Sequence, residues 1–234
     1  MTTLSDVELE SMTVAPWERA KQAIADGRPD DALALIDDAA QRTRGLQIYS
    51  IEWITSLLSF VGRELGEDAV ERALRVSSDD FIRARREPEG APPWDELPAS
   101  VRAKAIARAM VANGGACEVA EDEEKIVLSF RCGSGGRLID EARYEHDGGP
   151  YLTLHERGPR TFEREALPVY CAHCSVNNEI QPVEWGGAPT SIEYPPERAG
   201  EPCVHHVYKD VALIPDEAYV RIGATRSARP PSDA

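Results

Sequence analysis

Apolar positions in the first part of the chain recur at the three- and four-residue spacing that is typical of amphipathic helices. The pattern predicts helices over 16–26 and 30–45, and a further helix that begins at Gly66. The segment 46–61 is apolar on most of its sides, so we expect a core helix that other helices surround. The N-terminal half is therefore predicted to be helical.

Prolines and glycines crowd the segment 87–99, which is typical of a linker or an extended surface loop. Ser100 is positioned to cap a helix over 101–111, and Asn113 with the glycines after it provides a helix stop. The linker and this helix separate the helical half from a region of different character.

Beyond Gly115 the apolar period shortens to two, the period of β-strands. Residues 118–121 and 125–131 form a predicted hairpin around an acidic turn. Further short strands, separated by Gly and Pro turns, are expected over 137–144, 151–155, 180–185, 191–194 and 204–209. The predicted fold class is α+β, in which the helical half precedes a small, mostly antiparallel sheet built around a cysteine-rich metal site.

The two ends of the chain lack the apolar anchors of folded segments. With these ends, the expected organisation is a disordered segment 1–14, a helical domain 15–86, a linker 87–99, an α+β metal-binding domain 100–225 and a disordered tail 226–234.

Composition and charge narrow the range of partners. The 234 residues carry a net charge of −15, which disfavours binding to nucleic acid and to anionic membranes. The segment 46–61 is too short and too often interrupted by polar residues to be a membrane span, and residues 1–15 do not have the pattern of a signal peptide. We therefore expect a cytoplasmic protein whose thiols are reduced.

The cysteines carry the clearest chemical signal. Cys171 and Cys174 form a C-x-x-C pair, and Cys132 and Cys203 lie in the same half of the chain. All five histidines share that half: His146, His155, His173, His205 and His206. Reduced thiols in this pattern are more typical of a metal site than of a disulfide, so the sequence predicts zinc bound by Cys132, Cys171, Cys174 and Cys203.

An alternative ligand set replaces one cysteine by His205, His206 or His173 and leaves a coordination position open for water. A proton shuttle from Glu184, Glu201 or a second histidine would then support catalysis, with His205, His206 and Glu184 as the candidate catalytic residues. An iron–sulfur cluster on the four cysteines is a third possibility.

Cys132 also admits a nucleophile hypothesis, because the amides of the glycine-rich turn 133–136 can hold an oxyanion. Arg137 suggests a tyrosine-phosphatase loop, but the spacing from Cys132 is one residue shorter than in that family. The remaining cysteine, Cys117, fits a small apolar residue at a strand start.

Helices followed by a small sheet with late cysteines, as in the segment 132–136, the pair 171–174 and Cys203, resemble bacterial families grouped with L-2-amino-thiazoline-4-carboxylate hydrolase and the vinyl-reductase-type small-molecule-binding domains. The resemblance spans residues 100–210. It implies a small-molecule pocket between helices and sheet, near a cysteine-bound metal, and it is compatible with an enzyme or a sensor.

Two functional hypotheses follow. In the first, zinc serves a hydrolase or lyase that acts on a small polar or sulfur-containing molecule. In the second, zinc is purely structural in a small-molecule-binding or regulatory module, and the helical half docks a partner protein or a second copy of the chain.

Overall fold

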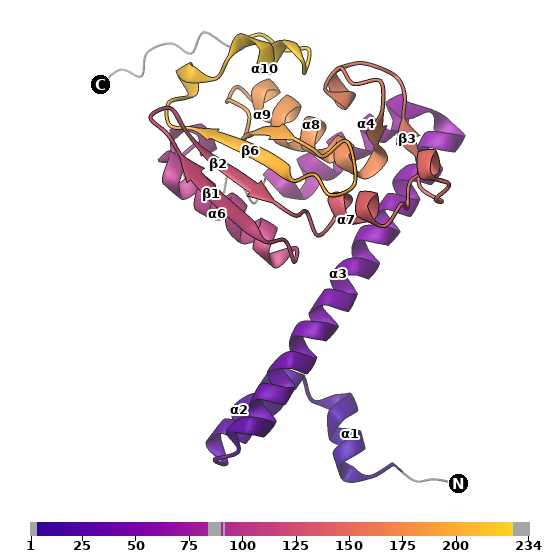
Figure 1. Cartoon of the computed structure of the whole chain (residues 1–234), viewed down its shortest axis with the longest axis vertical. Helices are drawn as coiled ribbons and strands as arrows, with labels where there is room; N and C mark the ends of the chain where they lie inside the picture. The colour runs from indigo at the N-terminus through magenta and orange to yellow at the C-terminus, as the bar shows by residue number, and fades with distance from the viewer. Residues whose placement is uncertain (1–3, 84–89, 91, 227–234) are drawn as a thin grey trace. The chain divides into compact units, whose positions relative to one another are not determined.

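The computed structural model describes residues 4–83, 90 and 92–226. Parts of the expected linker (87–89 and 91) and of the expected tail (227–234) lie outside these residues. The chain divides into two compact units at Ser50/Ile51, inside one helix, whereas the sequence analysis placed the division at the linker. Each unit is described by itself (Figure 1).

The first unit contains α1 (Asp6–Thr13), α2 (Pro16–Ala25) and the beginning of α3 (Pro29–Leu65). The helix α1 lies inside the segment 1–14, which the sequence analysis expected to be disordered, and residues 1–3 of that segment lie outside the described residues. It is stabilised by a capping box in which the Glu8 N–H donates to Ser5 Oγ at 3.3 Å and the Ser5 N–H donates to Glu8 Oε2 at 2.7 Å.

The helix α3 runs without a break for 37 residues, whereas the sequence predicted two helices that meet at Gly45. A glycine inside a helix lowers its stability by only about 1 kcal/mol, so it does not have to end the helix. In the second unit Ile51 and Leu58 are buried, but Leu57 and Phe60 remain 51% and 60% exposed. The expectation of a core helix surrounded by others is therefore wrong for one face of α3.

The second unit continues with α4 (Glu67–Ser77), which passes into a π-helical turn, Ser78–Ile82. Gly66, with φ of 85°, makes the turn between α3 and α4. A 3-10 turn, Trp94–Glu96, precedes α6 (Ala99–Ala112), whose cap position is Pro98 rather than the predicted Ser100. Within the described residues, no helix combines the length and apolar character that a membrane span requires.

The main sheet has the strand order β1-β2-β6-β5 and is antiparallel throughout. Its strands are β1 (Cys117–Glu121), β2 (Lys125–Phe130), β5 (Ile192–Tyr194) and β6 (Cys203–Tyr208). The helix α6 covers one face, where Ile106 packs with Leu128 and Val207. This arrangement confirms the α+β class and the antiparallel sheet in the C-terminal half.

Two short strands, β3 (Thr153–Leu154) and β4 (Leu167–Pro168), form a separate pair. The connections also contain the helices α7 (Gly135–Asp140), α8 (Ala172–Ser175), α9 (Gln181–Glu184) and α10 (Asp216–Val220), a π-helical turn at Val176–Ile180, and 3-10 turns at Glu145–Asp147, Pro159–Thr161, Val169–Cys171 and Val211–Leu213.

Two predicted strands are wrong. The segment 137–144 begins in α7, because the Arg137 and Leu138 N–H groups donate to the carbonyls of Cys132 and Ser134 and so start a helical turn. The segment 180–185 lies in α9 and the π-helical turn before it, where Pro182 occupies a first-turn position that suits proline.

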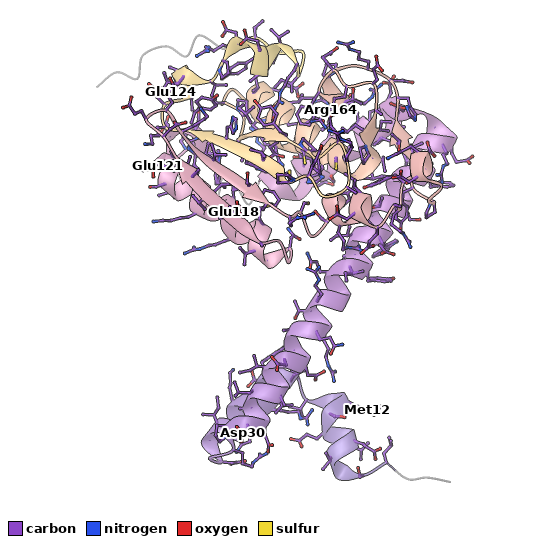
Figure 2. All side chains as sticks on the ribbon, viewed as in Figure 1. Met12, Asp30, Glu118, Glu121, Glu124 and Arg164 are labelled. Atoms are coloured by element: carbon purple, nitrogen blue, oxygen red, sulfur yellow. The ribbon has the colours of Figure 1, made fainter. Side chains whose placement is uncertain are left out.

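The strand β1 is an edge strand whose residues after Cys117 are exposed. Glu118 and Glu121 extend from it, and Glu124 from the turn after it (Figure 2). Charges on an edge strand discourage pairing with the edge of another sheet. Part of the net negative charge thus has a role at this edge.

Candidate functional site

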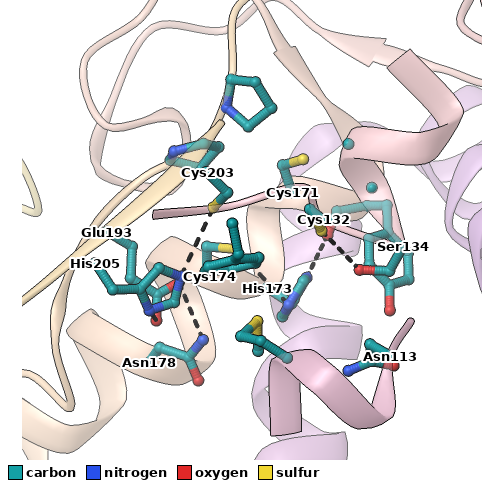
Figure 3. A pocket seen from close by; sticks show the side chains of 17 residues that line it. Asn113, Cys132, Ser134, Cys171, His173, Cys174, Asn178, Glu193, Cys203 and His205 are labelled. Atoms are coloured by element: carbon teal, nitrogen blue, oxygen red, sulfur yellow. Dashed lines mark hydrogen bonds and ion pairs between the residues drawn. The ribbon is translucent and has the colours of Figure 1, made fainter. Parts of the chain in front are cut away.

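Four of the five cysteines line one cavity of about 70 Å³ in the second unit (Figure 3). Cys132 lies in the loop after β2, Cys171 and Cys174 come from the 3-10 turn and helix at 169–175, and Cys203 is the first residue of β6. The fold thus brings together thiols from three parts of the chain that are well separated in sequence.

Local structure explains how the thiols reach the cavity. Cys171 and Cys174 are one helical turn apart, so their side chains share a face. The glycines after Cys132 leave room for them: a Cβ atom on Gly135 would lie 2.9 Å from Cys171 Sγ, and one on Gly136 would lie 2.8 Å from Cys132 Cβ. These positions must be glycine because any side chain would occupy space that the cysteines use.

The thiols of the cavity are reduced and mostly buried. Cys171, Cys174 and Cys203 are 4%, 7% and 4% exposed, and all five cysteines are free. Burial, and the repulsion that Cys132 and Glu193 would exert on a thiolate, raise the pKa of each of these three thiols. They are therefore neutral thiols at neutral pH, unlike the thiolates of activated cysteine nucleophiles.

His205 faces the cavity from β6, two residues after Cys203. Its Nε2 lies 3.7 Å from Cys203 Sγ, and its Nδ1 lies 3.0 Å from Ser191 Oγ. Ser191 Oγ donates to Glu193 Oε1 at 3.1 Å, so the Nδ1–H of His205 must be the donor to Ser191. This chain of hydrogen bonds leaves Nε2 as a lone-pair acceptor that is directed at the cavity.

Glu193 is 2% exposed and completes the orientation of His205. It pairs with His205 in the β5–β6 register, and its Oε1 lies 3.4 Å from His205 Nδ1. The Asn178 amide donates to Glu193 Oε2 at 3.2 Å. Burial lowers the pKa of His205, although Glu193 opposes this shift, so the imidazole is neutral and its Nε2 is available.

His173 forms another side of the cavity, between Cys171 and Cys174 in sequence. Its Nδ1 lies 2.5 Å from the Tyr170 carbonyl, which accepts, so Nδ1 carries the proton. Its Nε2 lies 3.7 Å from Cys174 Sγ. The cavity therefore has two imidazole rings, each with its Nε2 next to a thiol.

The spacing of the cavity side chains bears directly on metal binding. Within the part of the chain that the structure describes, no three His, Cys, Asp or Glu side chains form a group that could hold a metal ion. Binding an ion would require the thiols to move closer to one another.

Two of the predicted catalytic residues lie away from the cavity. His206 follows His205 on β6, so strand alternation directs it to the opposite face, where its ring packs against Tyr194 at 5.0 Å. Glu184 lies in α9, half exposed, and binds Arg75. Among the described residues, neither His206 nor Glu184 lines the cavity, although the sequence analysis expected both to act at the cysteines.

Other residues considered from the sequence also lie elsewhere. Glu201 binds Arg198 in a surface turn. Arg137 binds Glu141 at 2.6 Å instead of serving an anion-binding loop at Cys132. Cys117 is half-buried at the start of β1 and is not among the residues of the cavity.

The sequence analysis did not identify the residues that orient His205. Ser191 and Glu193 are two residues apart in a segment that was predicted as a strand, so their shared face was a usable signal. Their position beside His205 depends on the pairing of β5 with β6, which the sequence did not reveal.

Comparisons of the chain with protein-family models, curated protein sequences and solved structures gave no match. The resemblance stated from the sequence stays a prediction.

Proposed function

We propose that the cysteine cavity binds a thiophilic metal ion, zinc in the first instance, through Cys132, Cys171, Cys174 and Cys203. The observation that carries this proposal is the convergence of four reduced cysteines on one small cavity. Thiolates are preferred ligands of zinc, and a tetrahedral set of four is a common zinc site.

The surroundings of the thiols support an ion rather than a large ligand. A cavity of about 70 Å³ is well below the roughly 300–1,000 Å³ of typical small-molecule pockets. The glycines at 135 and 136 keep this space clear of side chains. The thiolates of Cys132, Cys174 and Cys203 would repel one another, and this raises the pKa of Cys174 and Cys203 when no cation is present. A bound metal ion would remove this repulsion, and the thiols would then lose their protons.

We further propose that only three protein ligands hold the ion in the active form, and that the open position then serves a hydrolase or lyase for a small polar or sulfur-containing molecule. A bound zinc ion supplies Lewis-acid activation of such a molecule or of water. His205 would accept, at Nε2, the proton that the activated molecule or water gives up. Its Nε2 is available because Ser191 and Glu193 hold the Nδ1–H on the other side of the ring. A reduced thiol site of this kind fits the cytoplasmic location expected from the sequence.

A purely structural zinc is the competing function, and the number of thiols favours it. Four cysteine ligands close a tetrahedral site and leave no position for a substrate. In that case His205 would orient a thiol and would not take part in chemistry.

Metal analysis of the full-length protein, purified under reducing conditions, tests the binding proposal. We expect about one zinc per chain by mass spectrometry of the metal content. Cys171→Ser should reduce this stoichiometry at least about tenfold, since each lost ligand weakens the site strongly. Cys117→Ser is the matched control and should bind a full equivalent. Equal metal content in the two variants, or no metal in the wild type after incubation with zinc, contradicts the proposal.

Cobalt substitution distinguishes the catalytic site from the structural one. The visible spectrum of the Co²⁺ protein reports the number of thiolate ligands. An open site should change its spectrum on adding a small thiol such as 2-mercaptoethanol, and a closed four-thiolate site should not. Acid-labile sulfide together with iron would identify an iron–sulfur cluster instead.

A further inference from the structure

An apolar groove of about 430 Å³ lies on the second unit next to the cysteine cavity. Ile54, Leu57 and Val61 of α3 line one wall, and Ala73 and Leu74 of α4 line another. Residues 170–177 close the remaining side. We call this feature the apolar groove.

The lining of the groove leaves apolar surface in contact with solvent. Ile54 and Leu57 are 45% and 51% exposed, although both lie in the middle of a helix that buries Ile51 and Leu58. Among the described residues that line the groove, none is Asp, Glu, Lys or Arg. Exposed apolar surface that is concave and free of formal charge is typical of a site for an uncharged ligand.

Tyr170 and His173 belong to both the groove and the cysteine cavity. The two rings meet edge to face, with centroids 4.8 Å apart. Because the Tyr170 carbonyl fixes the proton of His173 on Nδ1, Nε2 is directed toward Cys174 Sγ. Tyr170 and His173 therefore form the wall that the groove shares with the thiols.

We propose that the apolar groove binds an uncharged small molecule with an aliphatic or aromatic body, and that the polar end of this molecule lies at Tyr170 and His173. The volume of the groove is within the range of small-molecule pockets. Tyr170 and His173 are among the few polar residues of the described lining and can orient such a ligand. This inference goes beyond the metal proposal and does not require a metal to be bound.

A protein occupant would use more of the surface. A stable interface buries roughly 800 Å² on each partner, so it would extend onto the neighbouring face of α3. Phe60 lies on that face, is 60% exposed and does not line the groove. A change at Phe60 therefore separates the two occupants.

Fluorescence titration of the full-length protein with the uncharged dye N-phenyl-naphthylamine tests the proposal. We expect saturable binding to the wild type, and at least about tenfold weaker binding to Leu57→Glu, which puts a charge at the groove. Ala73→Phe fills the groove without adding a charge and should weaken binding to a similar extent. Phe60→Glu is the matched control on the same helix and should bind as the wild type does. Circular dichroism confirms that each variant is folded.

Two results overturn the inference. If Phe60→Glu loses dye binding to the same extent as Leu57→Glu, or if no variant affects it, the dye does not report the groove. If the wild type is a dimer by sedimentation velocity, binds no dye, and becomes monomeric in Leu57→Glu, a second copy of the chain occupies the groove. Titration with and without a chelator keeps this test separate from the metal proposal, since dye binding should persist in the metal-free protein.

Discussion

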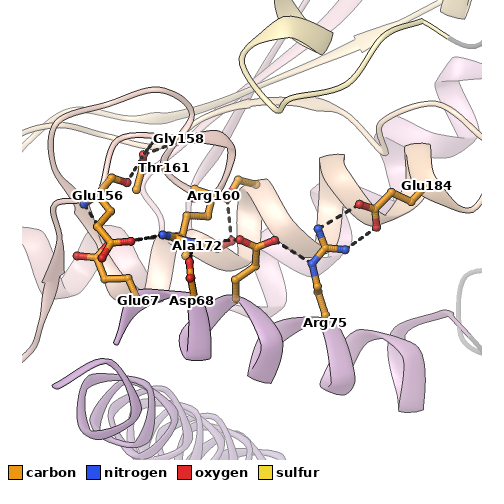
Figure 4. A network of polar contacts seen from close by, with 11 residues as sticks. Glu67, Asp68, Arg75, Glu156, Gly158, Arg160, Thr161, Ala172 and Glu184 are labelled. Carbon is orange, nitrogen blue, oxygen red and sulfur yellow. Dashed lines mark hydrogen bonds and ion pairs between the residues drawn. The ribbon is translucent and has the colours of Figure 1, made fainter. Parts of the chain in front are cut away.

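Two clusters of ionisable side chains in the second unit are built in opposite ways. In the arginine cluster, Arg160 faces Asp68 at 2.6 Å and Glu71 at 3.2 Å, and it also binds Glu156 (Figure 4). Arg75 donates to Glu71 at 2.9 Å and to Glu184 at 3.1 Å. Each guanidinium thus meets carboxylates of opposite charge.

In the cysteine cavity the three buried thiols are neutral, and they would repel one another if they ionised. Burial raises the pKa of Cys174 most, and the negative charges that Glu193, Cys203, Cys171 and Cys132 would carry raise it further. The three buried thiols stay protonated, and Ser191 and Asn178 donate hydrogen bonds to the carboxyl group of Glu193.

The contrast supports the metal proposal for the cysteine cavity. Opposite charges that already satisfy one another need nothing further, whereas converging thiols lose their protons only when a cation balances the resulting charge. Departures of this kind from the usual rules of burial are expected at functional sites.

The largest effect on stability should come from the arginine cluster. Arg160→Gln removes the cation that faces Glu67 and Glu71, which are 13% and 23% exposed, although Glu71 keeps its contact with Arg75. We expect the free energy of unfolding to fall by about 2–4 kcal/mol, as for other broken, largely buried ion pairs. Urea denaturation of the metal-free protein measures this change.

Two variants control this experiment. Arg157→Gln removes an exposed arginine with a single ion pair to Glu163, and it should change stability by less than about 0.5 kcal/mol. Cys132→Ser, in the cavity, should cost about 1 kcal/mol or less when metal is absent. A loss for Cys132→Ser that equals that of Arg160→Gln would mean that the cavity is part of the structural framework.

Glu179 combines features of both clusters and provides a test by pH. Its Oε1 lies 2.6 Å from Arg221 Nη2, yet burial raises the pKa of this carboxyl to about 8. A folded-state pKa above the unfolded value of about 4.3 means that the folded protein binds the extra proton. The stabilisation that comes from this bound proton is therefore complete below the unfolded pKa of about 4.3. It is lost as the pH rises through the folded pKa of about 8.

Glu179→Gln removes the titration and isolates its effect. The stability of the wild type relative to Glu179→Gln should fall by about 1–3 kcal/mol between pH 5 and pH 8, measured by urea denaturation at each pH. A difference that is constant with pH would show that Arg221 keeps Glu179 ionised throughout, as in the arginine cluster.

The sequence was informative where the relevant pattern is local. The C-x-x-C pair and the segregation of the cysteines predicted a thiol cluster, because residues one helical turn apart share a face. The period of two predicted β1, β2 and β6 closely. The sequence analysis identified the glycines after Cys132 as amide donors that can hold an oxyanion, whereas the structure shows that Gly135 and Gly136 leave room for Cys171 and Cys132.

The errors have a different origin. The segment 137–144 begins as a helix because its backbone N–H groups bond to the carbonyls of Cys132 and Ser134. The spacing of apolar residues gives no information about such bonds. The role of Glu193 depends on the register between β5 and β6, strands that are joined by a loop of irregular structure. The groove was missed because the apolar face of α3 was interpreted as buried core.

The smallest effect should come from His206, and it tests which face of β6 is directed at the cavity. His205 and His206 are adjacent, but only His205 lies among the thiols, because successive strand residues face opposite sides. His205→Gln removes the donor to Ser191 from a buried site and should cost about 1–2 kcal/mol. His206→Gln alters a half-buried ring beside Tyr194 and should cost less than about 0.5 kcal/mol.

If a metal binds, the Co²⁺ spectrum should change in His205→Gln and stay unchanged in His206→Gln. Equal spectral changes in both variants would mean that the register of β6 at the cavity differs from the one described, and with it the assignment of His205 as the proton acceptor.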